Sequence, residues 1–191
     1  MTKFNSDIIL YGGPGSGKGT QAQLLIKKLG AQHVDMGAEI RKLARGRSIR
    51  ARRIRSLMNA GQLIPVAITT HIARQRLRLA GRRPVIFDGY PRSPQQAIVL
   101  DRLLRQAHRS GTMIYLKLPV RVIRERLLRR AKLERRLDDQ NPTAIRRRVQ
   151  IFQTQARKLL AHYRGKIRVI TIDGNDTIAH IAKMINRRLG L

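Results

Sequence analysis

Short apolar runs alternate with longer amphipathic segments along most of the chain. The apolar runs have the length of buried strands. They predict strands over residues 8–11, 32–35, 84–88, 112–118 and 167–172. The segments between them carry apolar residues at helical spacing, which predicts helices over residues 21–29, 38–45, 50–60, 65–79, 94–109, 119–130, 142–162 and 177–188. This alternation predicts an α/β fold around a parallel sheet, with a ligand site beyond the carboxyl ends of the strands.

Two segments interrupt the alternation. Residues 36–79 contain only helical patterns between two predicted strands, and they predict a helical insertion. Residues 131–139 have no apolar period and predict a loop. No internal repeat, low-complexity segment or interdomain linker is visible, and 191 residues are enough for one domain with a full core.

A glycine-rich loop stands at the carboxyl end of the first predicted strand. Residues 12–20 read GGPGSGKGT and lead directly into a predicted helix. Glycines let successive N–H groups point at an anion, and the helix N-terminus adds positive potential at the same place. Lys18 is placed to reach the β- and γ-phosphates of a nucleotide. The general pattern has its hydroxyl directly after the lysine, whereas here Gly19 intervenes before Thr20. The loop predicts a nucleotide phosphate site.

The chain is strongly basic. It has 41 Lys and Arg against 11 Asp and Glu, a formal net charge of +30, and 31 of the basic residues are arginine. Such a field attracts polyphosphates and acidic polymers. The alternative is that arginine-rich codon usage has placed these residues on a solvated surface, where they have no binding function. A dedicated nucleic-acid reader usually shows stacking aromatic residues, and with three Phe, four Tyr and no Trp no such module is visible.

Composition also predicts the setting of the protein. The absence of cysteine excludes disulfides and thiolate metal sites. No apolar run approaches the roughly 20 residues that span a membrane. The first residues lead directly into the first predicted strand, which leaves no room for a cleaved signal. These features predict a soluble, cytoplasmic protein.

Three motifs, in order along the chain, resemble the adenylate kinase family, and the resemblance runs nearly end to end. The first is GPGSGKGTQ at residues 13–21, and the second is DGYPR at residues 88–92, with Tyr where the family has Phe. The third is RLLRR at residues 126–130 followed by RLDD at residues 136–139. The resemblance implies a P-loop kinase fold with a five-stranded parallel sheet in the order 2-3-1-4-5. It implies one domain with its core in residues 1–35, 80–130 and 137–191, a nucleoside-monophosphate-binding insertion in residues 36–79 and a short lid in residues 131–136.

The activity implied by this resemblance is the reversible, magnesium-dependent reaction ATP + AMP = 2 ADP, catalysed by a monomer. Phosphoryl transfer between two nucleotides needs no covalent intermediate, so positioning and charge neutralisation carry the catalysis. Planar guanidinium groups suit this task because each binds two phosphate oxygens. Two alternatives stay open: a UMP/CMP kinase, and a nucleotide-binding, kinase-like protein that acts on RNA or on a ribosomal surface. The basic surface is also expected to bind nucleic acid without sequence preference.

The resemblance assigns roles to residues by matched position. It assigns catalysis to Lys18, Asp88, Arg92, Arg130, Arg136 and Arg148. It assigns ATP binding to Gly13, Gly15, Ser16, Gly17, Lys18, Gly19, Thr20, Arg126, Arg130 and Asp176. It assigns AMP binding to Met36, Gly37, Arg41, Gln62, Leu63, Ile64, Gly89, Tyr90, Pro91, Arg92, Gln96, Arg136, Arg147 and Arg148.

Within these sets, the resemblance distinguishes several tasks. Arg41 and Arg92 would hold the α-phosphate of the acceptor, and Arg126 would stack on the adenine of the donor. Lys18, Arg130 and Arg136 would surround the transferring phosphoryl group. No residue is expected to ligate metal directly, since Mg²⁺ is coordinated mainly by substrate phosphates and water. It would lie near Thr20, Asp88, Asp138 and Asp139. The short lid is expected to carry no zinc, because no cysteine is available for a zinc site.

Two places depart from the family pattern. In the predicted helix over residues 142–162, spacing to the aromatic residues selects Arg148 as the last catalytic arginine, whereas counting from Asp139 selects Arg147. At the acceptor site, Met36 replaces a threonine and Ala38 an aspartate, while Gln96 matches the glutamine that reads the adenine edge. The pattern therefore predicts AMP as acceptor with a raised KM, and a Met36 thioether that packs on the base.

Overall fold

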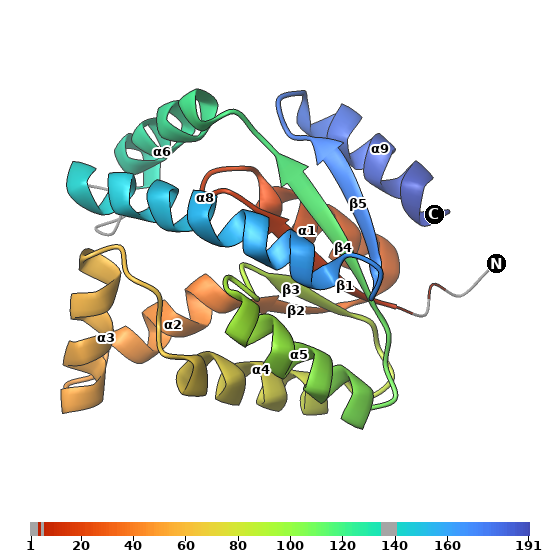
Figure 1. Ribbon diagram of the computed structural model, residues 1–191, viewed down its shortest axis with the longest axis horizontal. Helices are drawn as coiled ribbons and strands as arrows, with labels where there is room; N and C mark the ends of the chain where they lie inside the picture. Colours follow the sequence, from red (N-terminus) through yellow and green to blue (C-terminus); the bar gives the residue numbers. More distant parts are fainter. Residues whose placement is uncertain (1–3, 5, 135–140) are drawn as a thin grey trace.

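The computed structural model describes residue 4 and residues 6–134 and 141–191 of the chain (Figure 1). Five parallel strands form one sheet in the order β2-β3-β1-β4-β5, which confirms the predicted fold. The strands are β1 (Asp7–Gly12), β2 (Gln32–Asp35), β3 (Val85–Asp88), β4 (Gly111–Lys117) and β5 (Arg168–Asp173). Every strand therefore follows one of the predicted apolar runs.

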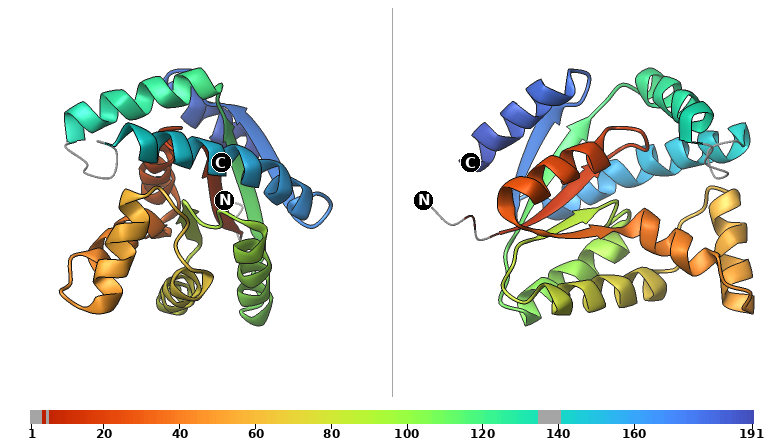
Figure 2. Two further views of the ribbon diagram at one scale, coloured as in Figure 1. Left: turned by 60° about the vertical axis from the view of Figure 1, so that its left-hand side comes forward. Right: turned by 180° about the vertical axis from the view of Figure 1, so that it is seen from behind.

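Helices connect the strands and cover both faces of the sheet (Figures 1 and 2). They are α1 (Lys18–Leu29), α2 (Met36–Ala44), α3 (Ile49–Asn59), α4 (Val66–Ala80), α5 (Pro94–Gln106), α6 (Val120–Glu134), α8 (Pro142–Tyr163) and α9 (Ile178–Leu189). Helices α2, α3 and α4 form the predicted insertion between β2 and β3. None of the helices in the described part of the chain combines the length and the apolar character needed to cross a bilayer.

Two helix boundaries differ from the prediction. Residues 131–134 continue α6 to Glu134, so the loop expected from residue 131 was wrong there. These residues, AKLE, are good helix formers, and their propensity sustains the helix after the apolar period is lost. Helix α5 ends at Gln106 rather than near residue 109, because His108 adopts a positive φ of 52° and turns the chain toward β4. The expected end of the lid at Arg136 lies outside the described residues.

The sheet separates two apolar layers. On one face, Ile9, Phe87 and Met113 pack against α4, α5 and α8. On the other face, Leu10 and Ile114 pack with other strand residues against α1 and α9. All six residues of β1 are buried, as expected for the central strand of a parallel sheet.

The strand register brings the predicted site residues to one edge of the sheet. Leu10 of β1 and Asp35 of β2 both pair with Asp88 of β3. Gly12 pairs with Leu116 of β4. This edge, where the strands end, is called the carboxyl edge below, and the opposite edge, where they begin, is called the amino edge.

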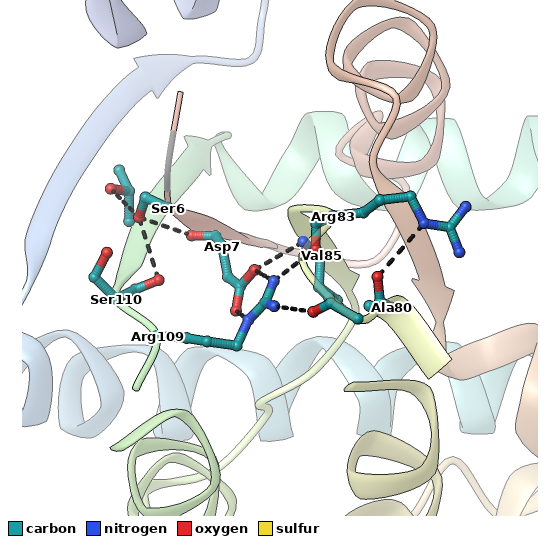
Figure 3. A network of polar contacts seen from close by, with 9 residues as sticks. Ser6, Asp7, Ala80, Arg83, Val85, Arg109 and Ser110 are labelled. Carbon is teal, nitrogen blue, oxygen red and sulfur yellow. Dashed lines mark hydrogen bonds and ion pairs between the residues drawn. The ribbon is translucent and has the colours of Figure 1, made fainter. Parts of the chain in front are cut away.

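A buried ion pair joins three strands at the amino edge (Figure 3). The Asp7 side chain is 1% exposed, and Arg109 donates to it through Nε at 2.8 Å and Nη2 at 2.5 Å. The same carboxylate accepts the Val85 N–H at 2.8 Å. Arg109 also donates to the carbonyl oxygens of Gly81 and Arg83, and its bonds to Asp7 raise the pKa of Arg109. The Asp7–Arg109 pair thus ties together the starts of β1, β3 and β4.

Candidate active site

A cleft of about 1010 Å³ opens at the carboxyl edge of the sheet. Its walls come from the glycine loop after β1, the start of α2, the α3–α4 connection, the β3–α5 loop, α6 and α8. Predicted donor and acceptor residues line this one cleft: Gly15, Ser16, Gly17, Lys18, Gly19, Thr20, Gly37, Arg41, Gln62, Leu63, Ile64, Asp88, Gly89, Pro91, Arg92, Arg126 and Arg148.

The glycine loop requires glycine at two positions for different reasons. Gly17 is the N-cap of α1 with a φ of 87°, a left-handed conformation that side chains disfavour. At Gly12, a Cβ atom would lie 2.7 Å from the Leu116 carbonyl oxygen, so a side chain would collide with β4. The loop therefore follows the end of β1 closely and brings the N-terminus of α1 into the cleft.

Lys18 lies across this loop. Its Nζ donates to the carbonyl oxygens of Gly12 at 2.9 Å and Gly13 at 2.8 Å, and to Ser16 Oγ at 3.2 Å. These bonds hold the ammonium group beside the N-terminus of α1, where the helix dipole also favours an anion. Lys18 and the helix end form a compact binding site for phosphate.

Asp88 faces the glycine loop from the end of β3. Burial alone would raise the pKa of Asp88, but the neighbouring His33 and the charges of Lys18 and Arg92 outweigh it and lower the pKa. His33 Nε2 lies 3.9 Å from Asp88 Oδ2, too far for a hydrogen bond, so its influence is electrostatic. Asp88 is therefore an ionised carboxylate next to the phosphate site.

Arginine side chains converge opposite the loop. Arg92 Nε donates to the Gly89 carbonyl oxygen at 2.8 Å, which orients its guanidinium group. Arg92 is exposed at the cleft that it lines, although protein atoms crowd around its guanidinium group. This reduced hydration and the nearby charges of Arg148 and Arg41 lower the pKa of Arg92, while Asp88 and Asp35 act in the opposite sense. Like charges gathered in this way define a polyanion site.

The geometry of α8 distinguishes its two candidate arginines. Ile145 and Val149 face the core, and Arg148 is half-buried beside them and lines the cleft. Arg147 is exposed and is not among the cleft-lining residues. Arg148, rather than Arg147, therefore lies near Arg92.

Several predicted residues lie elsewhere. Asp176 accepts a hydrogen bond from the Thr177 N–H at 2.6 Å and pairs with His180 at 3.3 Å, outside the cleft lining. Gly13 and Tyr90 are also outside the lining, and Tyr90 is 1% exposed in the core. The side chain of Arg130 and residues Arg136, Asp138 and Asp139 lie outside the described part of the chain.

The acceptor side differs most from the sequence prediction. Met36 is 1% exposed and belongs to the core with Ile40 and Ala44, so its thioether cannot pack on a base in the cleft. The spacing of these three residues in α2 is a helical core pattern that the sequence already contains. Asp35, which sequence reasoning missed, lines the cleft as the N-cap of α2, and its Oδ2 lies 3.9 Å from Arg41 Nη2.

Gln96 lies beneath this region and is 3% exposed. Its Oε1 accepts the Arg92 N–H at 2.6 Å, and its Nε2 donates to Thr69 Oγ1 at 3.3 Å. The Gln96 amide therefore fixes the backbone of Arg92, and it lies near the part of the cleft predicted to bind the acceptor. Arg129 is a further basic residue of the cleft lining that the motifs did not single out.

A glycine phosphate loop at the carboxyl edge of this sheet, faced by converging arginines, defines a P-loop enzyme that handles nucleotide phosphates. The family model described as "Adenylate kinase" matches residues 10–168. Similar curated proteins include "Adenylate kinase" of Thermosynechococcus vestitus, 31% identical over 96% of each chain, and "Adenylate kinase" of Thermus thermophilus, 34% identical over 96% of this chain and 97% of the relative. "Adenylate kinase 1" of Synechocystis is 35% identical over 94% of this chain and 95% of the relative.

The chain belongs to the adenylate kinase family. It is thereby an enzyme of the nucleoside-monophosphate kinase class, and the family resemblance of its three motifs is confirmed.

Proposed function

We propose that this enzyme transfers the γ-phosphoryl group of ATP to AMP, reversibly and with Mg²⁺. The observation that carries the proposal is the single cleft in which Lys18 and the N-terminus of α1 face Arg41, Arg92 and Arg148. One set of groups suits a donor triphosphate, and the other suits the phosphate of an acceptor. Two anions would be brought together in this space with their charges neutralised, as the reaction requires.

The proposed roles follow from position. The glycine loop and Lys18 hold the β- and γ-phosphates of ATP, and Arg126 lies against its adenine. Arg41 and Arg92 bind the phosphate of AMP, and each guanidinium can contact two oxygens. Arg148, which lies near Arg92, stabilises the negative charge of the phosphoryl group in transit.

The residues of the cleft fit a magnesium ion bound through phosphates and water. The lowered pKa of Asp88 keeps this carboxylate ionised beside Gly19, at the start of α1. Among residues 4, 6–134 and 141–191, no group of three or more acidic or histidine side chains is arranged to hold a metal directly. When bound, Mg²⁺ supplies charge neutralisation at the phosphates. Asp88 would orient its water ligands.

An assay of ADP formation tests the reaction and the acceptor. AMP should give the highest kcat/KM of AMP, CMP, UMP and GMP, and EDTA should abolish the rate. The amide of Gln96 retains one donor hydrogen and one acceptor position beyond its bonds to Thr69 and Arg92, but it is 3% exposed and outside the cleft lining, so it reads adenine only if the base reaches past the residues that cover it. A higher kcat/KM with CMP or UMP would instead support the UMP/CMP kinase alternative.

Replacing Gln96 by Ala should reduce the preference for AMP over CMP by about tenfold, the worth of one to two hydrogen bonds. The matched control is Gln95→Ala, because Gln95 is an exposed neighbour on the same turn of α5. The ratio of the two kcat/KM values is the readout. An unchanged ratio in the Gln96 variant would remove Gln96 from the specificity site.

The Asp35 carboxylate should weaken the binding of AMP. It lies 3.9 Å from Arg41 and competes with the phosphate of AMP for this guanidinium group. Asparagine at this position keeps the N-cap and removes the charge. Asp35→Asn should lower the KM for AMP by about twofold to fivefold, the range expected for one exposed ion pair, at unchanged kcat. Glu125→Gln, which removes the same charge from the exposed face of α6, should leave the KM unchanged. An equal change of KM in the two variants would show that AMP binding depends on the net charge of the protein and not on the position of Asp35.

A further inference from the structure

Basic side chains gather at the amino edge of the sheet. The strands are parallel, so the carboxyl ends of α1, α4, α5, α8 and α9 and the amino ends of the strands meet at this edge, on the right of Figure 1. The segments that meet there each carry two or three basic residues. Those that are exposed form what we call the basic band: Lys27, Lys28, Arg78, Arg82, Arg83, Arg105, Arg164, Lys166, Arg168, Arg187 and Arg188.

Acidic side chains do not offset this charge. Residues 27–32, 78–85, 105–112, 163–169 and 186–191, which build the band, contain no Asp or Glu. The acidic residue at the start of β1, Asp7, is 1% exposed and bonded to Arg109. The remaining carboxylates whose side chains the structure describes, Asp35, Glu39, Asp88, Asp101, Glu125, Asp173 and Asp176, lie outside these segments. The basic band therefore presents uncompensated positive charge to solvent.

Helix capping explains only part of this pattern. Lys27 and Lys28 lie in the last turn of α1, and Arg187 and Arg188 in the last turn of α9, where cations favour the helix dipole. Arg82, Arg83, Arg164, Lys166 and Arg168 lie beyond the helix ends. Of these five, Arg83 donates to the Ala80 carbonyl oxygen at the end of α4, and Arg168 donates to the Arg188 carbonyl oxygen in α9. Arg164 is the C-cap of α8, so helix-end stabilisation leaves Arg82 and Lys166 without an explanation.

The band is held in a defined shape. Arg168 Nη2 donates to the Arg188 carbonyl oxygen at 2.6 Å, and Arg168, Arg187 and Arg188 line a hollow with Met184. The Asp7–Arg109 pair fixes the carbonyl oxygens of Gly81 and Arg83 and so anchors the turn that carries Arg82 (Figure 3). The backbone that carries these charges is therefore held in place, and it presents them to a partner with regularly spaced anions.

We propose that the basic band binds the phosphate backbone of double-stranded nucleic acid. Four of the seven aromatic residues are buried, and the other three, Phe4, Tyr115 and Phe152, are partly buried. No Phe, Tyr or Trp ring is therefore exposed to stack on unpaired bases, the main source of affinity for single strands. A duplex carries one negative charge per roughly 1.7 Å of its axis, the denser polyanion, and suits a surface that contacts only phosphates.

The basic band and the cleft lie at opposite ends of the strands. The glycine loop follows the carboxyl end of β1, whereas the band surrounds the amino ends of the strands. Nucleic acid on the band therefore leaves the cleft open, and the kinase reaction should proceed at its ordinary rate in the complex.

Fluorescence anisotropy with a short DNA duplex of mixed sequence tests the proposal. The edge variant carries Arg82→Gln, Arg164→Gln, Lys166→Gln, Arg187→Gln and Arg188→Gln. The matched control carries Arg45→Gln, Arg47→Gln, Arg50→Gln, Arg52→Gln and Arg53→Gln, exposed arginines of α3 and the segment before it. Both variants lose the same five charges, so any difference between them reports location rather than net charge.

The wild type should bind the duplex more tightly than a single strand of the same length, with an affinity that falls steeply between about 50 and 200 mM salt. The edge variant should bind at least about tenfold more weakly at about 50 mM salt, since one lost phosphate contact is worth about that much. The control should change much less, and both should keep wild-type ADP formation. Equal losses in the two variants, a larger loss in the control, tighter binding of the single strand, or no binding by the wild type would each overturn the proposal.

Discussion

Replacing Arg92 by alanine should lower kcat by about 10² to 10³, the usual cost of removing one preorganised charge from a reacting group. Arg92 is suited to this role because Gly89 and Gln96 fix its side chain and backbone before substrate arrives. Its positive neighbours Arg148 and Arg41 make the empty site electrostatically unfavourable, and a phosphate relieves that repulsion. The loss should appear in steady-state kinetics as a fall in both kcat and kcat/KM.

Lysine at position 92 should rescue little of the activity, because a point charge cannot bind two phosphate oxygens in the way a guanidinium does. Arg147→Ala is the matched control, since Arg147 is exposed on α8 and does not line the cleft. It should retain kcat within about twofold, as expected of a surface position. Wild-type kcat/KM in Arg92→Ala, with the fold verified by circular dichroism, would contradict the proposed acceptor site.

Replacing Arg109 by alanine should lower the free energy of unfolding by about 3–5 kcal/mol, because it leaves the buried Asp7 carboxylate without its cation. The free energy of unfolding of an ordinary domain is about 5–15 kcal/mol, so the variant would lose a large part of its stability. Urea denaturation followed by circular dichroism measures the change.

Two further variants test whether the loss of stability comes from the unpaired Asp7 charge. Arg105→Ala removes an exposed arginine from the end of α5, four residues before Arg109, and should change stability by less than about 0.5 kcal/mol. Adding Asp7→Asn to Arg109→Ala should restore part of the loss, because the amide still accepts the Val85 N–H without a buried charge. A double variant less stable than Arg109→Ala alone would show that the unpaired charge is not the cause.

The glycine loop and the strand order were predictable from sequence because their signals are local or come from a resemblance. Residues 12–20 contain their own turn and helix-start chemistry, and residues 8–11 of β1 are a continuous apolar run. The Asp7–Arg109 pair has no such signal. Its members are 102 positions apart, and each is an ordinary charged residue until the sheet brings them together.

The acceptor side shows a different limit. Matching Met36 to a threonine fixed its place along the chain but not the direction of its side chain. That direction follows from the phase of α2, whose buried residues are Met36, Ile40 and Ala44. Asp35 was also recognisable as an N-cap at a strand end, but only the structure shows it beside Arg41.

The central position of β1 has a consequence for how the enzyme matures. Its neighbours β3 and β4 begin at Val85 and Gly111, so the two strands that pair with β1 are synthesised much later than β1 itself. Until then β1 is unpaired, and its apolar residues 8–11 form a run of the kind that promotes aggregation when exposed. A nascent chain that stops before Gly111 should therefore be unable to hold ATP, although it already contains the whole phosphate loop. Pairing across such long separations is slow, so the gain of nucleotide binding should coincide with late, global folding rather than with the first helix.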